Sequence, residues 1–356
     1  MLLRPARNLA LSVAATVAAL GLAEAWVRRF HPLEFRRPPA RAWGDYWRDL
    51  VHRPSLVPGL DYELKPSILR RLTYPPEFTV RTNALGMRDD ELVEPREPGT
   101  LRIAAVGDSM TFGLNVGNDE AWPNVLERIL EGERQDADGP VEVLNLGVTA
   151  YSASDDAVVV RSRALALEPD LVIVGYYLND PETDPVQLRQ HFREPSLWEH
   201  STLLRHLALQ RRLADQRRLG GGNVLRYLHA DEAKWAGVVA AFEDMARSSG
   251  RKSVPVLVAV LPTLYGFERF EDYPYRDIHR QVVEAAEQAG LFALDVLPAW
   301  EGCGIAPAGL RSDADHPDAR GQALIAEAIA AWVRTWHRER LAGLPPRATG
   351  SSLRRR

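Results

Sequence analysis

The chain has 356 residues, of which 46% are hydrophobic and 26% are charged, and its formal net charge is -4. This composition excludes a largely disordered chain, and the slightly acidic balance offers no general attraction to nucleic acid, so we expect no nucleic-acid partner. The single cysteine, Cys303, excludes an intramolecular disulfide and a cysteine-rich metal site. The length allows one large domain with extensions, or two ordinary domains.

Residues 1–30 have the pattern of a membrane anchor or a signal peptide. Apart from Glu24, the stretch from Leu9 to Val27 carries no charge, and arginines flank it on both sides. A membrane-spanning helix needs about 20 such residues. The tripeptide AEA at 23–25 also has the form of a signal-peptidase site, so cleavage is the main alternative, and a buried helix is a third. We favour an anchor with the main domain outside the cytoplasm; cleavage would instead give a secreted or periplasmic protein.

Residues 31–100 are rich in proline and aromatic residues, as in "HPLEFRRPPARAWGDYW". Proline at this density breaks helices, so we expect extended or irregular structure that packs on another part of the chain. Within this region, "EFTVRTNALGMRDDE" at 77–91 is typical of a strand followed by an Asn/Gly turn. We therefore interpret 31–100 as an N-terminal extension of a main domain.

From residue 101 to about 340, short apolar runs alternate with amphipathic stretches. Uninterrupted apolar runs indicate strands that are buried on both sides, and the alternation with helices is typical of an α/β protein with a parallel sheet between two helix layers. The predicted strands are 101–106, 141–146, 171–177, 254–261 and 291–296, and the predicted helices are 124–133, 156–168, 231–250, 276–290 and 319–336.

An insertion at 181–231 interrupts this alternation. It contains the basic stretch "LLRHLALQRRLADQRRL" at 203–219, which is followed by three glycines. We expect a solvated surface helix there, with a membrane-contacting or partner-binding helix as the alternative. The basic tail at 341–356 is predicted to be disordered.

Three of the predicted strands are followed by residues that could take part in catalysis or ligand binding. "GDSMTFG" follows the first strand and puts Ser109 at its carboxyl end; Gly147 follows the second strand, and Asn179 follows the third. Ligands of open α/β sheets bind at these ends. Taken singly, each residue has an ordinary explanation: a turn before a helix, a glycine between strand and loop, and a turn-forming Asn-Asp pair.

The fourth element is "DADHP", which lies in the loop before the last helix. Its Asp313 and His316 are three residues apart, close enough for the carboxylate to hold the far ring nitrogen of the imidazole, as a general base requires. A cluster of acids before a helix N-terminus is the alternative explanation. A serine at one strand end together with this pair favours a catalytic site.

Together, the four blocks resemble the SGNH hydrolase superfamily, also called GDSL-type esterases and lipases. The segment "TNALGMRDDE" at 82–91 resembles one that precedes the first block in larger, membrane-anchored members of the family. The resemblance covers 101–340. It implies a three-layer, flavodoxin-like fold with a central parallel five-stranded sheet, to which this chain adds its N-terminal extension. Two positions depart from the family pattern: Tyr177 stands where a glycine is usual, and Ala150 where a further glycine is common.

The resemblance also implies a catalytic role for each block. Ser109 would be the nucleophile, His316 its general base and Asp313 the acid that orients His316. The N–H groups of Ser109 and Gly147 and the side-chain amide of Asn179 would form the oxyanion hole, and Asp108 would support the turn that presents the serine.

The expected function is hydrolysis of acyl esters, short acyl groups ahead of long ones, on a small molecule or a cell-envelope carbohydrate. An O-acyltransferase would use the same residues to move acyl groups onto an envelope polysaccharide. A non-catalytic scaffold would be expected to lack one of them. No metal or cofactor is expected, because the sequence has no HExxH pair, P-loop or GxGxxG fingerprint.

Overall fold

The structure is a computed structural model that describes residues 3–31, 50–72, 76–134, 139–183, 189, 192 and 196–342. Part of the predicted extension and nearly all of the predicted basic tail lie outside these residues. The domain boundaries remain a prediction.

The core of the molecule is a sheet of five strands, all of them parallel. Nearly every residue of its three central strands is buried, because helices cover both faces, and this explains the uninterrupted apolar runs in the sequence. The observed sheet confirms the predicted fold class. In spatial order the strands are β6 (Val141–Asn145), β5 (Leu101–Gly107), β7 (Leu171–Tyr177), β8 (Val256–Leu261) and β9 (Phe292–Asp295).

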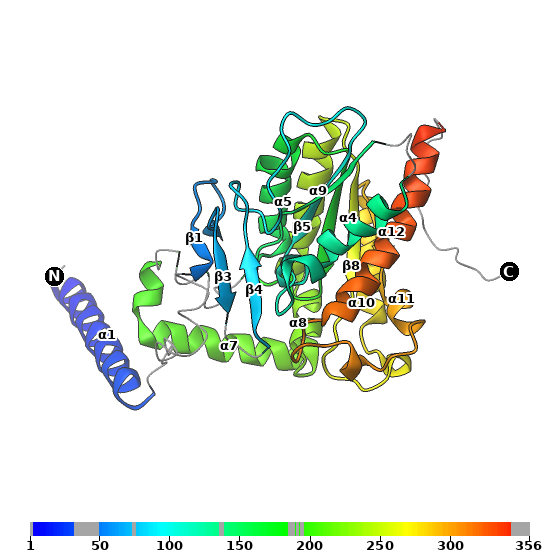
Figure 1. Cartoon of the computed structure of the whole chain (residues 1–356). Coiled ribbons are helices and arrows are strands. Elements are labelled where there is room, and N and C mark those ends of the chain that lie inside the picture. The colour runs from blue at the N-terminus through cyan, green and yellow to red at the C-terminus, as the bar shows by residue number, and fades with distance from the viewer. Residues whose placement is uncertain are drawn as a thin grey trace.

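Helices form a layer on each face of the sheet (Figure 1). On one side α4 (Trp122–Gly132) packs against α12 (Ala319–Leu341), and on the other α5 (Ala153–Ser162) packs against α9 (Glu232–Gly250). The predicted helix at 156–168 is interrupted: α5 ends at Ser162 and a 3₁₀ turn follows. The remaining elements of the main domain are α3 (Ser109–Phe112), η1 (Asn118–Glu120), η2 (Ala164–Leu167), α8 (Val224–Ala230), η4 (Phe270–Asp272), α10 (Arg276–Gln288), α11 (Leu297–Glu301) and η5 (Pro307–Gly309).

Two antiparallel hairpins precede the sheet, β1 (His52–Pro54) with β2 (Tyr62–Leu64), and β3 (Leu69–Leu72) with β4 (Phe78–Arg81). The first hairpin packs on the loop that follows β6. The Tyr62 hydroxyl donates to the carbonyl of Thr149 (2.8 Å), and His52 Nε2 lies 3.0 Å from the Thr149 hydroxyl. This part of the extension is therefore in contact with the carboxyl edge of the sheet.

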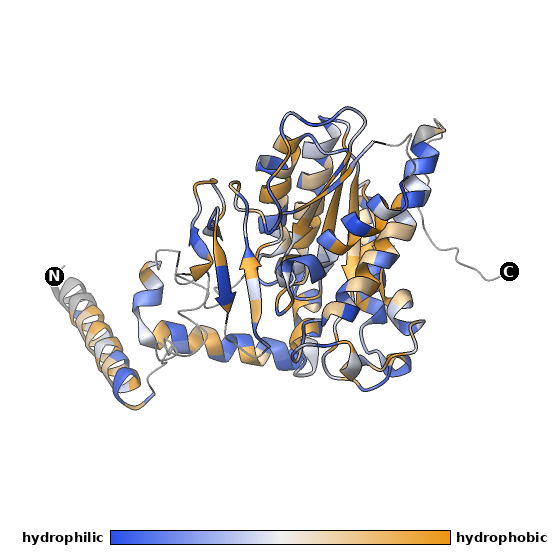
Figure 2. Cartoon of the chain, in the orientation of Figure 1, coloured by the Kyte–Doolittle hydropathy of each residue, from blue (hydrophilic) through white to orange (hydrophobic). Residues whose placement is uncertain are grey.

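The N-terminal helix α1 (Leu3–Phe30) contacts the start of α7 (Thr202–Gly220), the helix of the insertion, which follows η3 (Leu197–His200). Within the described residues, one segment is long and apolar enough to cross a membrane, Leu11–Phe30 of α1. Most of its large apolar side chains are exposed, whereas Val27 is buried. Figure 2 shows hydrophobic strands in the sheet, whereas hydrophobic and hydrophilic residues alternate along α7. Much of α7 is exposed, including several leucines.

Candidate active site

The segment after β5 presents a serine at the carboxyl edge of the sheet. Asp108 caps the short helix α3, because its Oδ1 accepts a hydrogen bond from the N–H of Met110 (2.8 Å). Ser109 is the first residue of that helix. Asp108 is fully buried, and burial raises the pKa of its carboxyl to about 6. This contact agrees with the supporting role expected for Asp108.

The loop before α12 brings an imidazole to this serine. His316 Nε2 lies 2.9 Å from the hydroxyl oxygen of Ser109. On the other side of the ring, Nδ1 lies 2.9 Å from Oδ2 of Asp313, and the backbone N–H of His316 donates to Oδ1 of the same carboxylate (2.8 Å). The three residues therefore form a continuous hydrogen-bonded chain of carboxylate, imidazole and hydroxyl, although 207 positions separate the serine from the histidine.

The electrostatics of these three hydrogen-bonded side chains suit a general base. Burial lowers the pKa of His316, but the hydrogen bond and charge of Asp313, with a contribution from Asp108, more than offset it, so the pKa lies above 6.5. For Asp313, burial raises the pKa, and hydrogen bonds from His316 and the loop backbone outweigh this and hold it well below its ordinary range. The carboxylate therefore stays ionised while the imidazole exchanges its proton.

Gly147 lies against the helix that carries the serine. A Cβ at this position would fall 2.3 Å from the backbone nitrogen of Phe112 and 2.7 Å from the carbonyl carbon of Thr111, so only glycine fits. Its N–H, expected in the oxyanion hole, donates to Oδ1 of Asn145 (3.0 Å). To bind an oxyanion, this N–H must share or exchange that hydrogen bond.

Asn179 follows β7 at the same edge of the sheet. Its amide oxygen is buried and accepts no hydrogen bond from any residue that the structure describes. Two buried carboxyls lie in this region, Asp180 next in the chain and Asp156 on α5. Burial raises the pKa of both well above the ordinary value, and the charge of Asp108 raises it further.

The structure shows the backbone and contacts of the two residues that depart from the family pattern. Ala150 adopts a φ of 61°, a left-handed conformation that favours glycine. Tyr177 is buried, and its hydroxyl donates to that of Thr263 (3.0 Å).

Two residues that the sequence analysis did not single out also contact this site. Asn115 Nδ2 donates to Oδ2 of Asp313 (2.7 Å), and Arg88 of the extension is fully buried against the carbonyls at the end of α3. Arg88 lies in the segment 77–91, for which the sequence predicted a strand and an Asn/Gly turn but not this contact.

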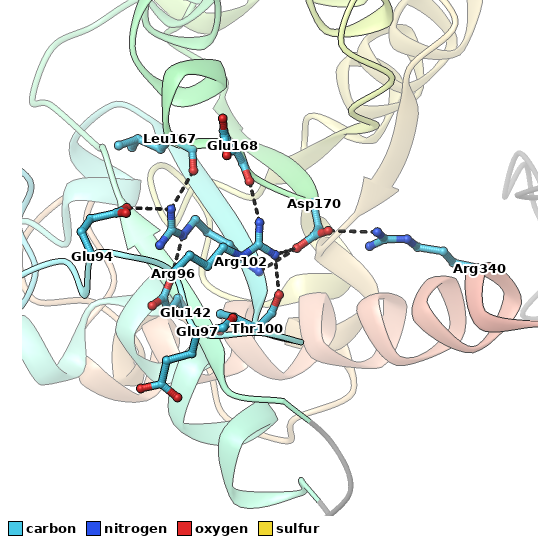
Figure 3. A network of polar contacts seen from close by, with 10 residues as sticks. All are labelled: Glu94, Arg96, Glu97, Thr100, Arg102, Glu142, Leu167, Glu168, Asp170 and Arg340. Carbon is cyan, nitrogen blue, oxygen red and sulfur yellow. Dashed lines mark hydrogen bonds and ion pairs between the residues drawn. The ribbon is translucent and has the colours of Figure 1, made fainter.

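A second polar cluster lies at the opposite edge of the sheet (Figure 3), beside a cavity of about 520 Å³. Arg96 and Arg340 both pair with Asp170, while Arg102 pairs with Glu142 and Glu94. These charges neutralise one another and tie the extension and α12 to the strand starts. No group of His, Cys, Asp and Glu among the described residues could hold a metal ion.

A family model described as "GDSL-like Lipase/Acylhydrolase family" matches residues 105–324. No curated protein matches the chain.

Solved structures with low sequence identity also resemble the chain. A putative lipolytic protein of the G-D-S-L family from Desulfitobacterium hafniense DCB-2 shares 16% identity (TM-score 0.39) over 65% of this chain and 98% of its own. Axe2, an acetylxylan esterase from Geobacillus stearothermophilus, shares 15% identity (TM-score 0.42) over 65% of this chain and 92% of its own. LAE5, an alpha/beta hydrolase from the metagenome of Lake Arreo, Spain, shares 14% identity (TM-score 0.43) over 65% of this chain and 93% of its own.

Proposed function

Because the chain belongs to the GDSL-like lipase/acylhydrolase family and is a serine hydrolase that acts on ester bonds, we propose that Ser109 is its nucleophile and that short acyl esters are its substrates. The observation that carries this proposal is the distance of 2.9 Å between the Ser109 hydroxyl and Nε2 of His316, with Asp313 on the other ring nitrogen.

In the proposed mechanism the serine oxygen attacks the ester carbonyl while His316 Nε2 takes its proton. Asp313 holds Nδ1–H and stabilises the imidazolium that forms. The N–H groups of Ser109 and Gly147 and the side-chain amide of Asn179 stabilise the oxyanion. The imidazolium then protonates the departing alcohol, which leaves an acyl-serine, and the same histidine activates the water that hydrolyses it.

The pH dependence of this mechanism follows from the raised pKa of His316. Only the neutral imidazole can accept the serine proton, so kcat/KM should rise with pH and level off above the pKa of His316, which lies above 6.5.

The preference for short acyl groups rests on Tyr177. The family commonly has glycine at this position, two residues before Asn179, whereas here a buried tyrosine side chain is fixed by its hydrogen bond to Thr263. A bulky, anchored side chain leaves less room for a long acyl chain than glycine would. A short acyl ester of a cell-envelope carbohydrate is the substrate we favour, with acyl transfer to a carbohydrate hydroxyl as the alternative outcome of the same acyl-enzyme.

We further propose that α1 stays attached as a membrane anchor, with the main domain outside the cytoplasm. Glu24 accepts hydrogen bonds from the N–H groups of Thr202 and Leu203 (2.8 Å each), so it caps the first turn of α7. Arg28 donates to the carbonyl of His200 (3.0 Å). Cleavage after Ala25 would remove this cap from α7, which favours an uncleaved anchor.

The test of the proposed function is ester hydrolysis by the detergent-solubilised full chain. We expect turnover of p-nitrophenyl acetate and less of the octanoate ester, and we expect S109A to lose about 10⁴-fold or more in kcat. The matched control is S162A, which removes an exposed hydroxyl on α5. Comparable turnover by S109A and the native chain would overturn the proposal. A preference for octanoate would overturn the short-acyl assignment, and acyl transfer to added carbohydrate would identify a transferase.

A further inference from the structure

The triad acid Asp313 has a fourth hydrogen-bond donor that comes from outside its own loop. Oδ1 accepts the backbone N–H groups of Asp315 and His316 (2.8 Å each), and Oδ2 lies 2.9 Å from His316 Nδ1. The side-chain amide of Asn115 donates to Oδ2 at 2.7 Å and also lies 3.3 Å from the hydroxyl of Ser312. Oδ2 is the carboxylate oxygen nearer to Nδ1 of His316. Asn115 therefore bonds to the oxygen that orients the imidazole ring.

The backbone at Asn115 adopts a conformation that is uncommon for residues other than glycine. Its φ is 69°, in the left-handed region that asparagine tolerates better than most residues with a side chain. The residue is 7% exposed, so water does not readily replace its hydrogen bond. It therefore combines a rare backbone conformation, burial and a short bond to a charged group.

The loop that carries Asn115 is held from its other side by the N-terminal extension. The guanidinium of Arg88 donates to the carbonyls of Phe112, Gly113 and Val116 (2.5 Å each). Its other donors reach the carbonyl of Thr79 and the side-chain oxygen of Asn118, so each nitrogen is bonded. A fully buried, planar cation with five fixed donors thus holds the carbonyls on both sides of Asn115.

We propose that Asn115 is a positioning residue for Asp313, and that Arg88 holds the loop from which Asn115 reaches it. The N-terminal extension is then part of the catalytic apparatus rather than a spacer between anchor and enzyme. This proposal rests on the proposed role of Asp313 in the triad.

The first test measures how fast a fluorophosphonate labels Ser109 at different pH values in the full chain. The charged groups that face His316 are Asp313 and Asp315 of its own loop and Asp108 at the end of β5. We expect N115G, which keeps the left-handed backbone but removes the donor, to slow labelling about tenfold or more at neutral pH. Its ascending pH limb should move down toward 6.5, because a carboxylate that is no longer aimed at the ring supports the imidazolium less.

The variant N115D keeps the shape of the side chain. Its new carboxyl can donate to Asp313 only while protonated, and it repels Asp313 once ionised. We therefore expect labelling by N115D to fall again at higher pH, a descending limb that the native chain lacks. A residue with a merely structural role would lower the melting temperature without changing the shape of the pH profile.

The second test is a double-mutant cycle with R88K, which keeps the charge but loses the planar fork. If Arg88 acts through Asn115, R88K slows labelling several-fold in the native background and adds little to N115G. The matched control is R102K: Arg102 is equally buried, but it lies at the start of β5, about 20 Å from the serine edge, and is expected to affect stability only.

The outcomes separate this inference from the proposed function. If the native chain is not labelled at Ser109, the proposed function fails and this inference fails with it. If the native chain is labelled, and N115G and N115D match it in rate and pH profile, the positioning role of Asn115 is wrong while the proposed function stands. Additive effects of R88K and N115G would refute the role of Arg88.

Discussion

The packing of Gly147 against α3 allows the effect of one methyl group to be worked out. In G147A the new Cβ would lie 2.3 Å from the nitrogen of Phe112, where ordinary contacts begin at 3.4 Å, so about 1 Å of movement is needed. The atoms in the way are backbone, and no side-chain rotation relieves the overlap. Since Ser109 is the first residue of this four-residue helix, the movement displaces the nucleophile or the oxyanion loop.

A misplacement of about 1 Å in an active site costs on the order of 10² in rate. We therefore expect kcat of G147A on p-nitrophenyl acetate to fall about 100-fold, with the far-ultraviolet circular dichroism of the folded chain retained. The matched control is A150G in the same loop, which relieves a left-handed residue instead of creating a clash and should stay within about twofold of the native kcat. A folded G147A with kcat within threefold of the native value would refute the packing argument.

Two further predictions concern stability and the anchor. Asp156 has a raised pKa in the folded chain. Its protonation therefore stabilises the fold at pH values below 3.8, the pKa of an aspartate in the unfolded chain, and this stabilisation is lost as the pH rises through the pKa of the folded state. D156N should therefore raise the melting temperature more at pH 8 than at pH 5, and an equal change at both values would contradict this assignment. The chain extracted from membranes should retain Glu24, as judged by mass spectrometry of its N-terminal peptide, whereas an N-terminus at Trp26 would refute the anchor.

The sheet and the Asp313–His316 pair could be predicted because their signals are local, whereas the pairing of Ser109 with His316, 207 positions apart, was expected from the resemblance to the four family blocks. Uninterrupted apolar runs identify strands covered on both faces, and the Asp-x-x-His spacing brings a carboxylate to a ring nitrogen within one loop. The end of α5 at Ser162 was missed, because the apolar pattern continues through the 3₁₀ turn that follows.

The residues around the triad could not be predicted in the same way. Asn115 and its partner Asp313 are 198 positions apart, and nothing in the pattern around either residue identifies the other. Arg88 appears in the sequence as one charge in a polar turn, and only the fold encloses it among the carbonyls after α3. Side-chain contacts of this kind depend on how distant segments come together, and a single sequence records the segments without their pairing.

The contacts of the first hairpin also bear on the order in which the protein can fold as it is made. Tyr62 and its acceptor Thr149 are 87 positions apart, so the hairpin leaves the ribosome well before the loop on which it packs. At about 5–20 residues per second, several seconds pass before that loop is available. During this interval the hairpin residues have only nascent chain and solvent, or a chaperone, to contact. The extension is thus synthesised before the main domain, but its packing must wait until β5 and β6 have emerged.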